Sequence, residues 1–594
     1  MRKTLSLIVV LLLILGTMGI ASAEAPAPKA GGTFIMSAYF DPPPALNFNP
    51  TAPSGNPDSN EYCFERLFDY VSVPNPIFRP RMAESFTSDG ETTTVFLRDN
   101  LKWSDGSALT SADIKNSYLI RFLSNDRVWK YLEKIDTPDD TTVVFTWKTV
   151  SSLNNILLFN QAIQYSVAQY GKWAEEAEPF LADRIYDEVS KEFKNSDESN
   201  EKVLSIREDL MTFKPLEAEA LFNSAYKAAS SNASEITLDK NEFYWNADNV
   251  YVDHVRVIAY VSAESFLANV QAGLYTSDNH GTPPDVYEEI MKIPDLRFGW
   301  LADLGQPAFN FNMKKDFTMI PEVRKAINYA VDRIALLEIA EPGTLTPDLT
   351  NSGLTPMWHS VVPQSFIDEL TVYDYDPDAA IAELESIGWT KGGDGYFVDE
   401  NGAPVTIEVA SMNSWPIYFI CGDAIVDYLK EIGLNASFNA MELSAYWTYI
   451  DQGSTNVLAD FRGGCPRLGP WEAYYNLIYE SYDRMGFMTR DDFNAQKDII
   501  LTMSDGTEVN TTEQINILFS TTDNDEYVAA TQVMMKLFND QCYFMPIGEK
   551  YMPYRCYDPS FVYPDYVEGS PDWFGTGPNT YSRWLAMGQA YFAE

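Results

Sequence analysis

Apolar and polar residues alternate in several short segments of this chain, which is the pattern of strands with one buried face. Five segments either show this alternation or are rich in β-branched and aromatic residues: 92–97 (TTTVFL), 253–261 (DHVRVIAYV), 308–313 (AFNFNM), 405–410 (VTIEVA) and 435–438 (NASF). We expect each of them to form a strand.

Other segments place apolar residues three or four positions apart, which predicts helices with one buried face. Such helices are expected to start near Thr110, Ser265, Pro321, Asp376 and Ile417, and the last two to end at Gly388 and Gly433. One more amphipathic helix is expected over residues 171–196, with a polar loop at 195–201. Because strands and helices alternate along the chain, the expected class is α/β.

Residues 97–118 (LRDNLKWSDGSALTSADIKNSY) combine a strand end, a tight turn and a helix start. Ser104, Asp105 and Gly106 are typical of a turn, because Gly accepts a positive φ and Asp bonds its own backbone. Thr110 is expected to cap the helix, with Asp113 three residues later in the manner of a capping box. The segment has no nucleophile beside a base, so we interpret it as a structural corner.

The first residues indicate export. Arg2 and Lys3 precede an apolar run at residues 5–20, and Ala21-Ser22-Ala23 follows as a cleavage signal. This is the pattern of a signal peptide over residues 1–23, which predicts a periplasmic or extracellular protein. No cysteine stands at the cleavage point, so a lipid anchor is not indicated.

Charge and composition narrow the function. The 594 residues carry 85 acidic and 42 basic side chains, and a net charge of −43 repels nucleic acid. The chain has three histidines and no metal-binding motif, so we expect no metal and no cofactor. Motifs of serine hydrolases and of nucleotide-binding loops are absent from the sequence, so we expect no enzyme. A secreted glycoside hydrolase that uses two carboxylates remains an alternative.

There are five cysteines, and an exported chain could pair four of them. Cys542 and Cys556 are close in sequence, so a local disulfide between them is expected.

Five segments, in order, resemble the extracellular solute-binding proteins of the peptide/nickel family, the receptor components of ABC importers. They are the 97–118 segment, 239–245 (DKNEFYW), 309–333 (FNFNMKKDFTMIPEVRKAINYAVDR), 373–389 (YDYDPDAAIAELESIGW) and 428–438 (YLKEIGLNASF). The resemblance spans most of the chain, from about residue 31 to 590.

This resemblance implies a bilobal periplasmic-binding-protein fold, with two α/β lobes joined by two crossing strands at a hinge and an accessory domain on the first lobe. The implied boundaries are 24–70, 226–310 and 546–594 for the first lobe, 71–225 for the accessory domain with a helical insertion, and 311–545 for the second lobe. The solute would lie in the cleft between the lobes. Its implied partner is the membrane permease of an ABC importer, and the protein is expected to be a monomer.

The resemblance also points to solute-binding residues. Peptide-binding members hold the free amine with a carboxylate in a segment that corresponds here to residues 461–475 (FRGGCPRLGPWEAYY). Arg467 takes the place of that carboxylate, and Glu472 is the alternative in a shifted alignment. Arginine repels an ammonium ion and suits a carboxylate or phosphate. The candidate ligand-binding residues are Asn413, Trp415, Tyr446, Trp447, Arg462, Arg467 and Trp471.

Two solutes fit these residues. An oligopeptide is the main expectation, and an oligosaccharide or another non-peptide solute, bound by aromatic stacking together with Arg467, is the alternative. A solute sensor without transport is a further alternative.

Overall fold

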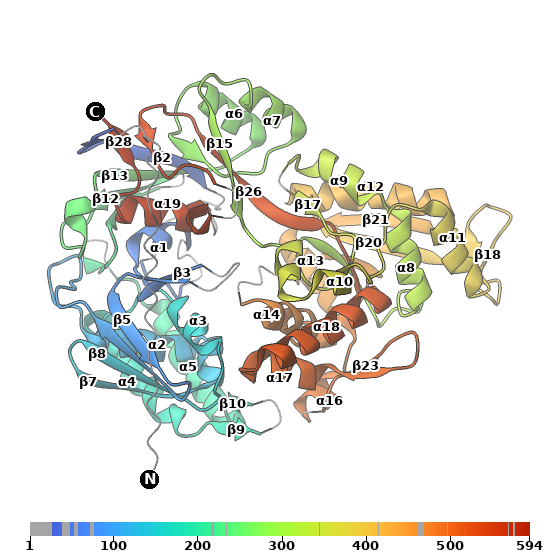
Figure 1. Cartoon of the computed structure of the whole chain (residues 1–594), viewed down its shortest axis with the longest axis horizontal. Helices are drawn as coiled ribbons and strands as arrows, with labels where there is room; N and C mark the ends of the chain where they lie inside the picture. Colours follow the sequence, from blue (N-terminus) through green and yellow to red (C-terminus); the bar gives the residue numbers. More distant parts are fainter. Residues whose placement is uncertain are drawn as a thin grey trace, which may run out of the picture.

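The structure is a computed structural model, and it describes residues 26–38, 48–52, 57–71, 77–188, 191–215, 219–232, 234–343, 345–413, 415–460, 468–495, 497–567, 570–573 and 577–594. The expected signal peptide lies outside these ranges, as do Arg462, Cys465 and Arg467. The described residues form a first lobe, an accessory domain and a second lobe, which lie at the upper left, lower left and right of Figure 1.

The first lobe contains an eight-stranded mixed sheet in the order β11-β12-β13-β2-β14-β26-β15, with β17 paired to β26. Its strands are β2 (Thr33–Ala38), β11 (Tyr226–Ser231), β12 (Glu235–Lys240), β13 (His254–Ala259), β14 (Ser277–Asp278), β15 (Arg297–Ala302), β17 (Leu345–Pro347) and β26 (Gly548–Cys556). The helices α1 (Pro57–Cys63), α6 (Ala263–Gln271), α7 (Pro284–Ile290) and α19 (Gly577–Ala586) pack around it. A small sheet joins β1 (Pro28–Lys29), β28 (Tyr591–Ala593) and β27 (Phe561–Val562).

The accessory domain contains an antiparallel sheet in the order β5-β6-β8-β7. Its strands are β5 (Ala83–Ser88), β6 (Thr92–Leu97), β7 (Leu132–Asp139) and β8 (Thr142–Trp147), with the hairpins β3 (Phe68–Val71) to β4 (Ile77–Pro80) and β9 (Ile185–Asp187) to β10 (Glu192–Lys194). Its helices are α2 (Ser111–Leu123), α3 (Asn154–Phe159), α4 (Val167–Ala177) and α5 (Asp197–Thr212).

The second lobe contains a five-stranded sheet in the order β21-β20-β22-β16-β25. Its strands are β16 (Ala308–Phe311), β20 (Thr406–Met412), β21 (Asn435–Met441), β22 (Val457–Asp460) and β25 (Phe544–Pro546). The helices α8 (Pro321–Ala330), α9 (Arg333–Ala340), α11 (Pro377–Ser386), α12 (Pro416–Ile432) and α13 (Leu443–Asp451) surround the sheet. The helices α14 (Pro470–Tyr474), α16 (Arg490–Asn494), α17 (Thr511–Ser520) and α18 (Asn524–Gln541) extend the lobe toward the accessory domain.

Two short segments connect the sheets of the two lobes. Residues 303–307 lead from β15 to β16, and Ile547 leads from β25 back to β26. The backbone N–H of Ile547 donates to the carbonyl of Pro307 at 2.9 Å, and that of Lys550, at the start of β26, donates to the carbonyl of Gly305 at 2.7 Å. This pair is the geometry of a hinge, where a few loop residues absorb the change in backbone angles.

One apolar cluster continues from the accessory domain into the second lobe. The rings of Tyr131, beside β7, and Phe519, on α17, stack at 3.9 Å. The two parts therefore touch through these rings, which is the arrangement of closed lobes. Figure 1 shows that α17 lies well away from the hinge end of β26.

The predicted helix starts and ends are confirmed where a capping residue marks them. Thr110 and Asp113 form the expected capping box of α2, Asp376 caps α11, and Gly433 ends α12 with a φ of 101°. The expected strands at 92–97 and 253–261 appear as β6 and β13.

The helix expected over residues 171–196 is wrong. The structure ends α4 at Ala177, adds a short 3₁₀ turn that contains Pro179, and continues with the β9–β10 hairpin. The expected polar loop at 195–201 is also wrong, because α5 begins there. Ser196 caps it by accepting from the backbone N–H of Ser199 at 3.2 Å, and two acidic residues follow in its first turn.

The expected disulfide is also wrong. Cys542 and Cys556 are both free and buried, one at the C-terminal end of α18 and the other at the end of β26. Cys63 and Cys421 are free and buried as well.

Candidate functional site: a cavity between the accessory domain and the second lobe

A cavity of about 610 Å³ lies between the accessory domain and the second lobe. On the accessory side it is lined by residues from the end of α2, the 3₁₀ turn Arg127–Lys130, the β9–β10 hairpin and one face of α5. On the other side it is lined by α14, the turns after it, α16 and α17. Its volume is within the range of small-molecule sites.

Aromatic rings form much of the cavity wall. Tyr131 comes from the accessory domain, and Trp471, Tyr475, Tyr479 and Phe519 come from the second lobe. Residues Tyr475–Tyr479 form a π-helical turn, a rare element that is frequent at functional sites, and it stacks Tyr475 on Tyr479 with ring centroids 5.4 Å apart.

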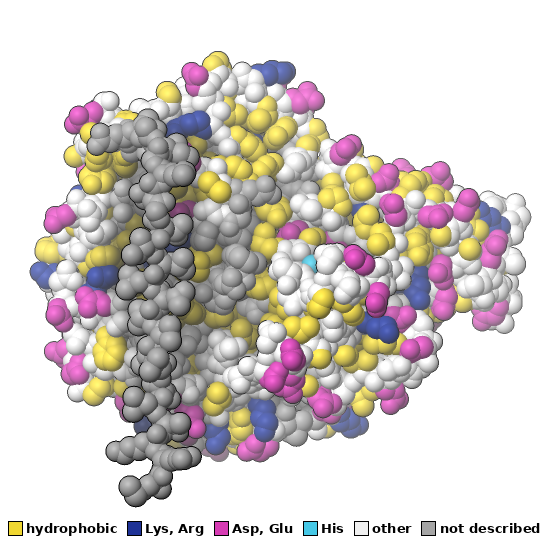
Figure 2. Space-filling model, in the orientation of Figure 1, with side chains coloured by type: hydrophobic (Ala, Val, Ile, Leu, Met, Phe, Trp, Pro, Cys, Tyr) yellow, Lys and Arg dark blue, Asp and Glu magenta, His cyan; other side chains and the backbone are white. Residues whose placement is uncertain are grey.

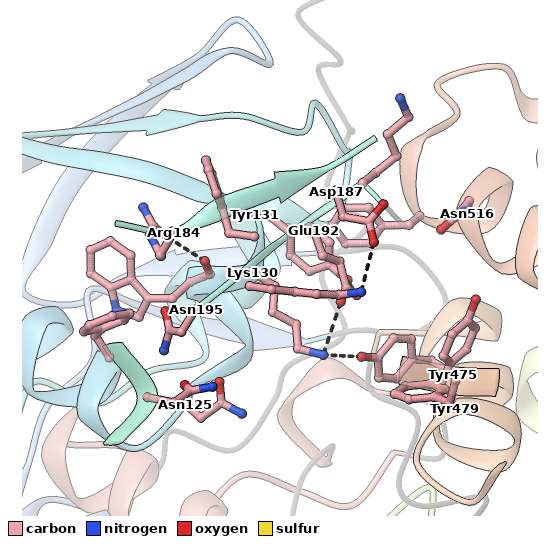
Figure 3. A pocket seen from close by; sticks show the side chains of 18 of the residues that line it. Asn125, Lys130, Tyr131, Arg184, Asp187, Glu192, Asn195, Tyr475, Tyr479 and Asn516 are labelled. Atoms are coloured by element: carbon pink, nitrogen blue, oxygen red, sulfur yellow. Dashed lines mark hydrogen bonds and ion pairs between the residues drawn. The ribbon is translucent and has the colours of Figure 1, made fainter. Parts of the chain in front are cut away.

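A polar network crosses the cavity between the two parts (Figure 3). Lys130 donates to the Tyr475 hydroxyl and pairs with Glu192 at 3.4 Å, and the Tyr131 hydroxyl donates to Glu192 at 2.9 Å. Burial alone would lower the pKa of Lys130, but Tyr475 and Glu192 raise it above its ordinary value, so the ammonium stays charged.

Arg184 also lines this cavity, but its hydrogen bonds stabilise the local fold of the accessory domain. It donates to the carbonyls of Trp129, Leu132, Glu133 and Leu181 at 2.7–3.1 Å. Burial lowers its pKa to about 10, and the carbonyls provide its hydrogen-bond partners.

Arg127, on the same 3₁₀ turn as the lining residue Lys130, connects the accessory domain to the second lobe. It donates to Glu472 at 3.1 Å, to Asn476 at 3.2 Å and to Glu480 at 2.7 Å, all in the second lobe. Glu472 also accepts from the backbone N–H of Leu468 at 3.0 Å. The alternative candidate for amine capture is therefore engaged by an arginine in this closed arrangement.

Two of the expected ligand-binding residues are buried: Trp471 at the cavity and Tyr446 in the core of the second lobe. Trp471 lines the cavity and is 1% exposed. Tyr446 is fully buried among apolar side chains of the second lobe, and its hydroxyl donates to the carbonyl of Ala459. Its position is that of a core residue, not of a cavity wall.

Three others lie near the carboxyl edge of the second-lobe sheet. Asn413 and Trp415 follow β20, and Asn413 donates to Glu442, which follows β21, at 2.9 Å. Trp415 is 40% exposed and stacks on Tyr418, and Trp447 packs half-buried against Tyr446. Ligands of α/β sheets bind outside the carboxyl ends of parallel strands, so solute contact at Asn413, Trp415 and Trp447 stays a prediction. Arg462 and Arg467 lie outside the described residues.

Sequence reasoning missed the accessory side of the cavity. Lys130, Tyr131, Glu192 and the face of α5 carry no motif, and they come together only in the tertiary structure. The one available signal was the cap at Ser196, which marks the start of α5.

Comparisons with known proteins place the chain in a family. Residues 78–483 match the family model described as bacterial extracellular solute-binding proteins, family 5 Middle. The chain belongs to this family. The Periplasmic oligopeptide-binding protein OppA of Haemophilus influenzae is 22% identical over 451 residues, which cover 70% of this chain and 78% of that protein.

Solved structures share the fold of this family member. The oligopeptide-binding protein AppA of Bacillus subtilis, in complex with a nonapeptide, superposes with a TM-score of 0.65 at 15% identity, covering 96% of this chain and 100% of that one. A Thermotoga maritima periplasmic oligopeptide-binding protein with bound mannohexaose superposes with a TM-score of 0.66 at 16% identity, covering 94% and 98%. These likenesses confirm the α/β bilobal fold; the residue boundaries of the lobes stay a prediction.

Three further observations describe this family member. Among the described residues, no helix has both the length and the apolar character needed to cross a membrane. These residues also bring no group of three His, Cys, Asp or Glu side chains together in a way that could hold a metal ion. Acidic side chains are spread over both halves of the face in Figure 2 rather than gathered in one patch.

Proposed function

We propose that this protein captures an oligopeptide between the second lobe and the accessory side of the first, and delivers it unaltered to the permease of an ABC importer. Family membership supports solute binding, and the name of the Haemophilus influenzae relative supports a peptide as the solute. The proposed protein is an exported monomer.

The observation that carries this proposal is the location of the cavity. It is bounded by two parts of the molecule that are connected covalently only through the first lobe and the hinge. Closure about the hinge would bury a solute there and opening would release it. Such a mechanism makes and breaks no covalent bond.

The chemistry of the wall supports a peptide. Aromatic faces suit apolar side chains, and the carboxylates of Asp197 and Asp498 line the same cavity. Neither carboxylate pairs with a cation of the described residues, so either can receive the ammonium group of a peptide.

An oligosaccharide is the second candidate solute. The stacked rings of Tyr475 and Tyr479 and the half-exposed Trp415 present aromatic faces of the kind on which sugar rings stack. A protein of the same fold holds mannohexaose.

A binding screen separates the two candidates. The full chain without residues 1–23 is incubated with a pool of random pentapeptides and, separately, with linear manno-oligosaccharides, and bound species are identified by native mass spectrometry. We expect peptide complexes and a smaller radius of gyration by small-angle scattering when peptide is added. Binding of the sugars alone would contradict the peptide proposal, and cleavage of either pool would contradict a pure binding function.

A further inference from the structure

Among the described basic residues that line the cavity, one forms no ion pair and has a buried side-chain nitrogen without a hydrogen-bond partner. Its basic lining residues are Lys130, Arg184, Lys191, Lys194, Arg207 and Lys497. Lys130 and Arg184 have the partners described above. Lys191 pairs with Glu188 at 3.1 Å, Lys194 with Asp187 at 2.9 Å and Lys497 with Asp492 at 2.5 Å.

Arg207 differs from these five. Its Nε atom is buried without a hydrogen-bond partner, and within the described part of the chain its guanidinium forms no ion pair. It lies on the face of α5 that lines the cavity together with Asn200, Val203 and Leu204, at the three- and four-residue spacing of one helix side. The helix places Arg207 at the cavity, and no salt bridge with the described residues holds its side chain there.

An arginine that forms no ion pair with the described residues is a candidate binding group for an anionic solute. The net charge of −43 disfavours the entry of an anion, so an anionic solute needs a local cation. A guanidinium fits a carboxylate through two parallel hydrogen bonds, and a half-enclosed site strengthens this interaction.

The surroundings of Arg207 favour a carboxylate over a more highly charged group. Four acidic side chains line the same cavity, namely Asp187, Glu192, Asp197 and Asp498, and they would repel a phosphate dianion more strongly than a single carboxylate. Leu204, which lies one turn before Arg207 and is 52% exposed, offers apolar surface to the side chain that bears the carboxylate.

We propose that Arg207 binds a carboxylate of the solute, which in an oligopeptide is the C-terminal carboxylate. This inference rests on the proposed function, because it assigns one end of a solute bound in the same cavity. It predicts that the protein discriminates a peptide with a free C-terminus from the same peptide with an amidated one.

The test compares two random pentapeptide pools, one with free C-terminal carboxylates and one C-terminally amidated, by native mass spectrometry and by competition. The variants are Arg207→Gln, which removes the charge, and Arg207→Lys, which keeps the charge but lacks the planar guanidinium that can donate two parallel hydrogen bonds. Lys202→Gln is the matched control, because Lys202 also lies on α5 but pairs with Glu198 at 2.8 Å away from the cavity. Circular dichroism and thermal unfolding verify that all variants fold.

We expect the wild type and Lys202→Gln to prefer the free-acid pool by at least about tenfold, which is the scale of one charge-assisted hydrogen-bonded contact. Arg207→Gln should lose this preference, and Arg207→Lys should keep part of it. Wild-type binding of both pools with equal affinity, or an undiminished preference in Arg207→Gln, would overturn the role of Arg207 and leave peptide capture intact. Failure to bind either pool would overturn both.

Discussion

The guanidinium of Arg127 in the accessory domain donates to the carboxylate of Glu472 in the second lobe at 3.1 Å, across 345 residues of sequence. Arg127 also contacts Asn476 and Glu480, so one side chain connects the accessory domain to α14 and to the π-helical turn after it. The two parts are connected covalently only through the first lobe and the hinge, so this contact stabilises the closed arrangement, together with the Lys130–Tyr475 hydrogen bond and the Tyr131–Phe519 stack.

Replacing Arg127 should therefore favour opening. For Arg127→Gln we expect a larger radius of gyration by small-angle scattering and about tenfold weaker peptide binding, since three charge-assisted or polar contacts are lost on closure only. Lys134→Gln is the control, because Lys134 pairs with Asp136 within the accessory sheet at 2.7 Å. An Arg127→Gln protein as compact as the wild type would show that the contact does not hold the lobes together.

Glu549 predicts a pH dependence of stability. It lies on β26 beside the hinge and is 2% exposed, and burial raises the pKa of its carboxyl from 4.5 to about 7, with the charge of Asp348 adding to the rise. The folded state therefore binds this proton more tightly than the unfolded state, so its stabilising effect is complete below about pH 4.5 and is lost as the pH rises through about 7.

Glu549→Gln isolates this effect. Relative to the variant, the wild type should lose up to roughly 3 kcal/mol of unfolding free energy between pH 4.5 and pH 8, measured by urea unfolding at a series of pH values. If the unfolding free energies of the two proteins changed with pH in parallel, the Glu549 carboxyl would titrate as it does in water.

A buried ion pair in the first lobe predicts a large loss of stability. Arg555 on β26 donates to Asp278 on β14 at 2.6 Å, and both side chains are 0% exposed. Asp278→Asn leaves the arginine charge buried without a counter-ion, which should cost about 3–5 kcal/mol. Asp136→Asn removes the carboxylate of an exposed pair and should cost under about 1 kcal/mol in the same urea titration. Equal costs would contradict the importance of burial.

Two glycines with positive φ separate backbone strain from steric overlap. Gly353 has a φ of +82°, and a Cβ there would lie 2.6 Å from a ring carbon of the buried Tyr474. Gly506 has a φ of +87° and open space around it. Gly506→Ala should cost about 1 kcal/mol for the left-handed backbone, and Gly353→Ala about 1–3 kcal/mol more for overpacking, as measured by thermal unfolding. A similar loss in both variants would mean that Tyr474 moves without cost.

Elements defined by local chemistry could be predicted from sequence. The box of Thr110 with Asp113, the cap at Asp376 and the glycine stop at Gly433 each act within one helical turn, so their effect is encoded by neighbouring residues. The prediction for the region after α4 was wrong because the local pattern there did not decide the structure. Its apolar spacing resembles a helix, but the chain turns into the β9–β10 hairpin, where Tyr186 and Phe193 pack across the two strands at 5.2 Å.

The sequence by itself determined the α/β class, the family resemblance, the acidic character and most helix ends, because these depend on composition and on contacts between near neighbours. Only the tertiary structure decided that Tyr131 faces Trp471 and Phe519, and that Glu472 pairs with Arg127. It also decided that Arg207 on α5 lines the cavity and forms no ion pair with the described residues. These relationships join residues hundreds of positions apart, and their energies depend on burial and on the distance between charges, neither of which a local pattern contains.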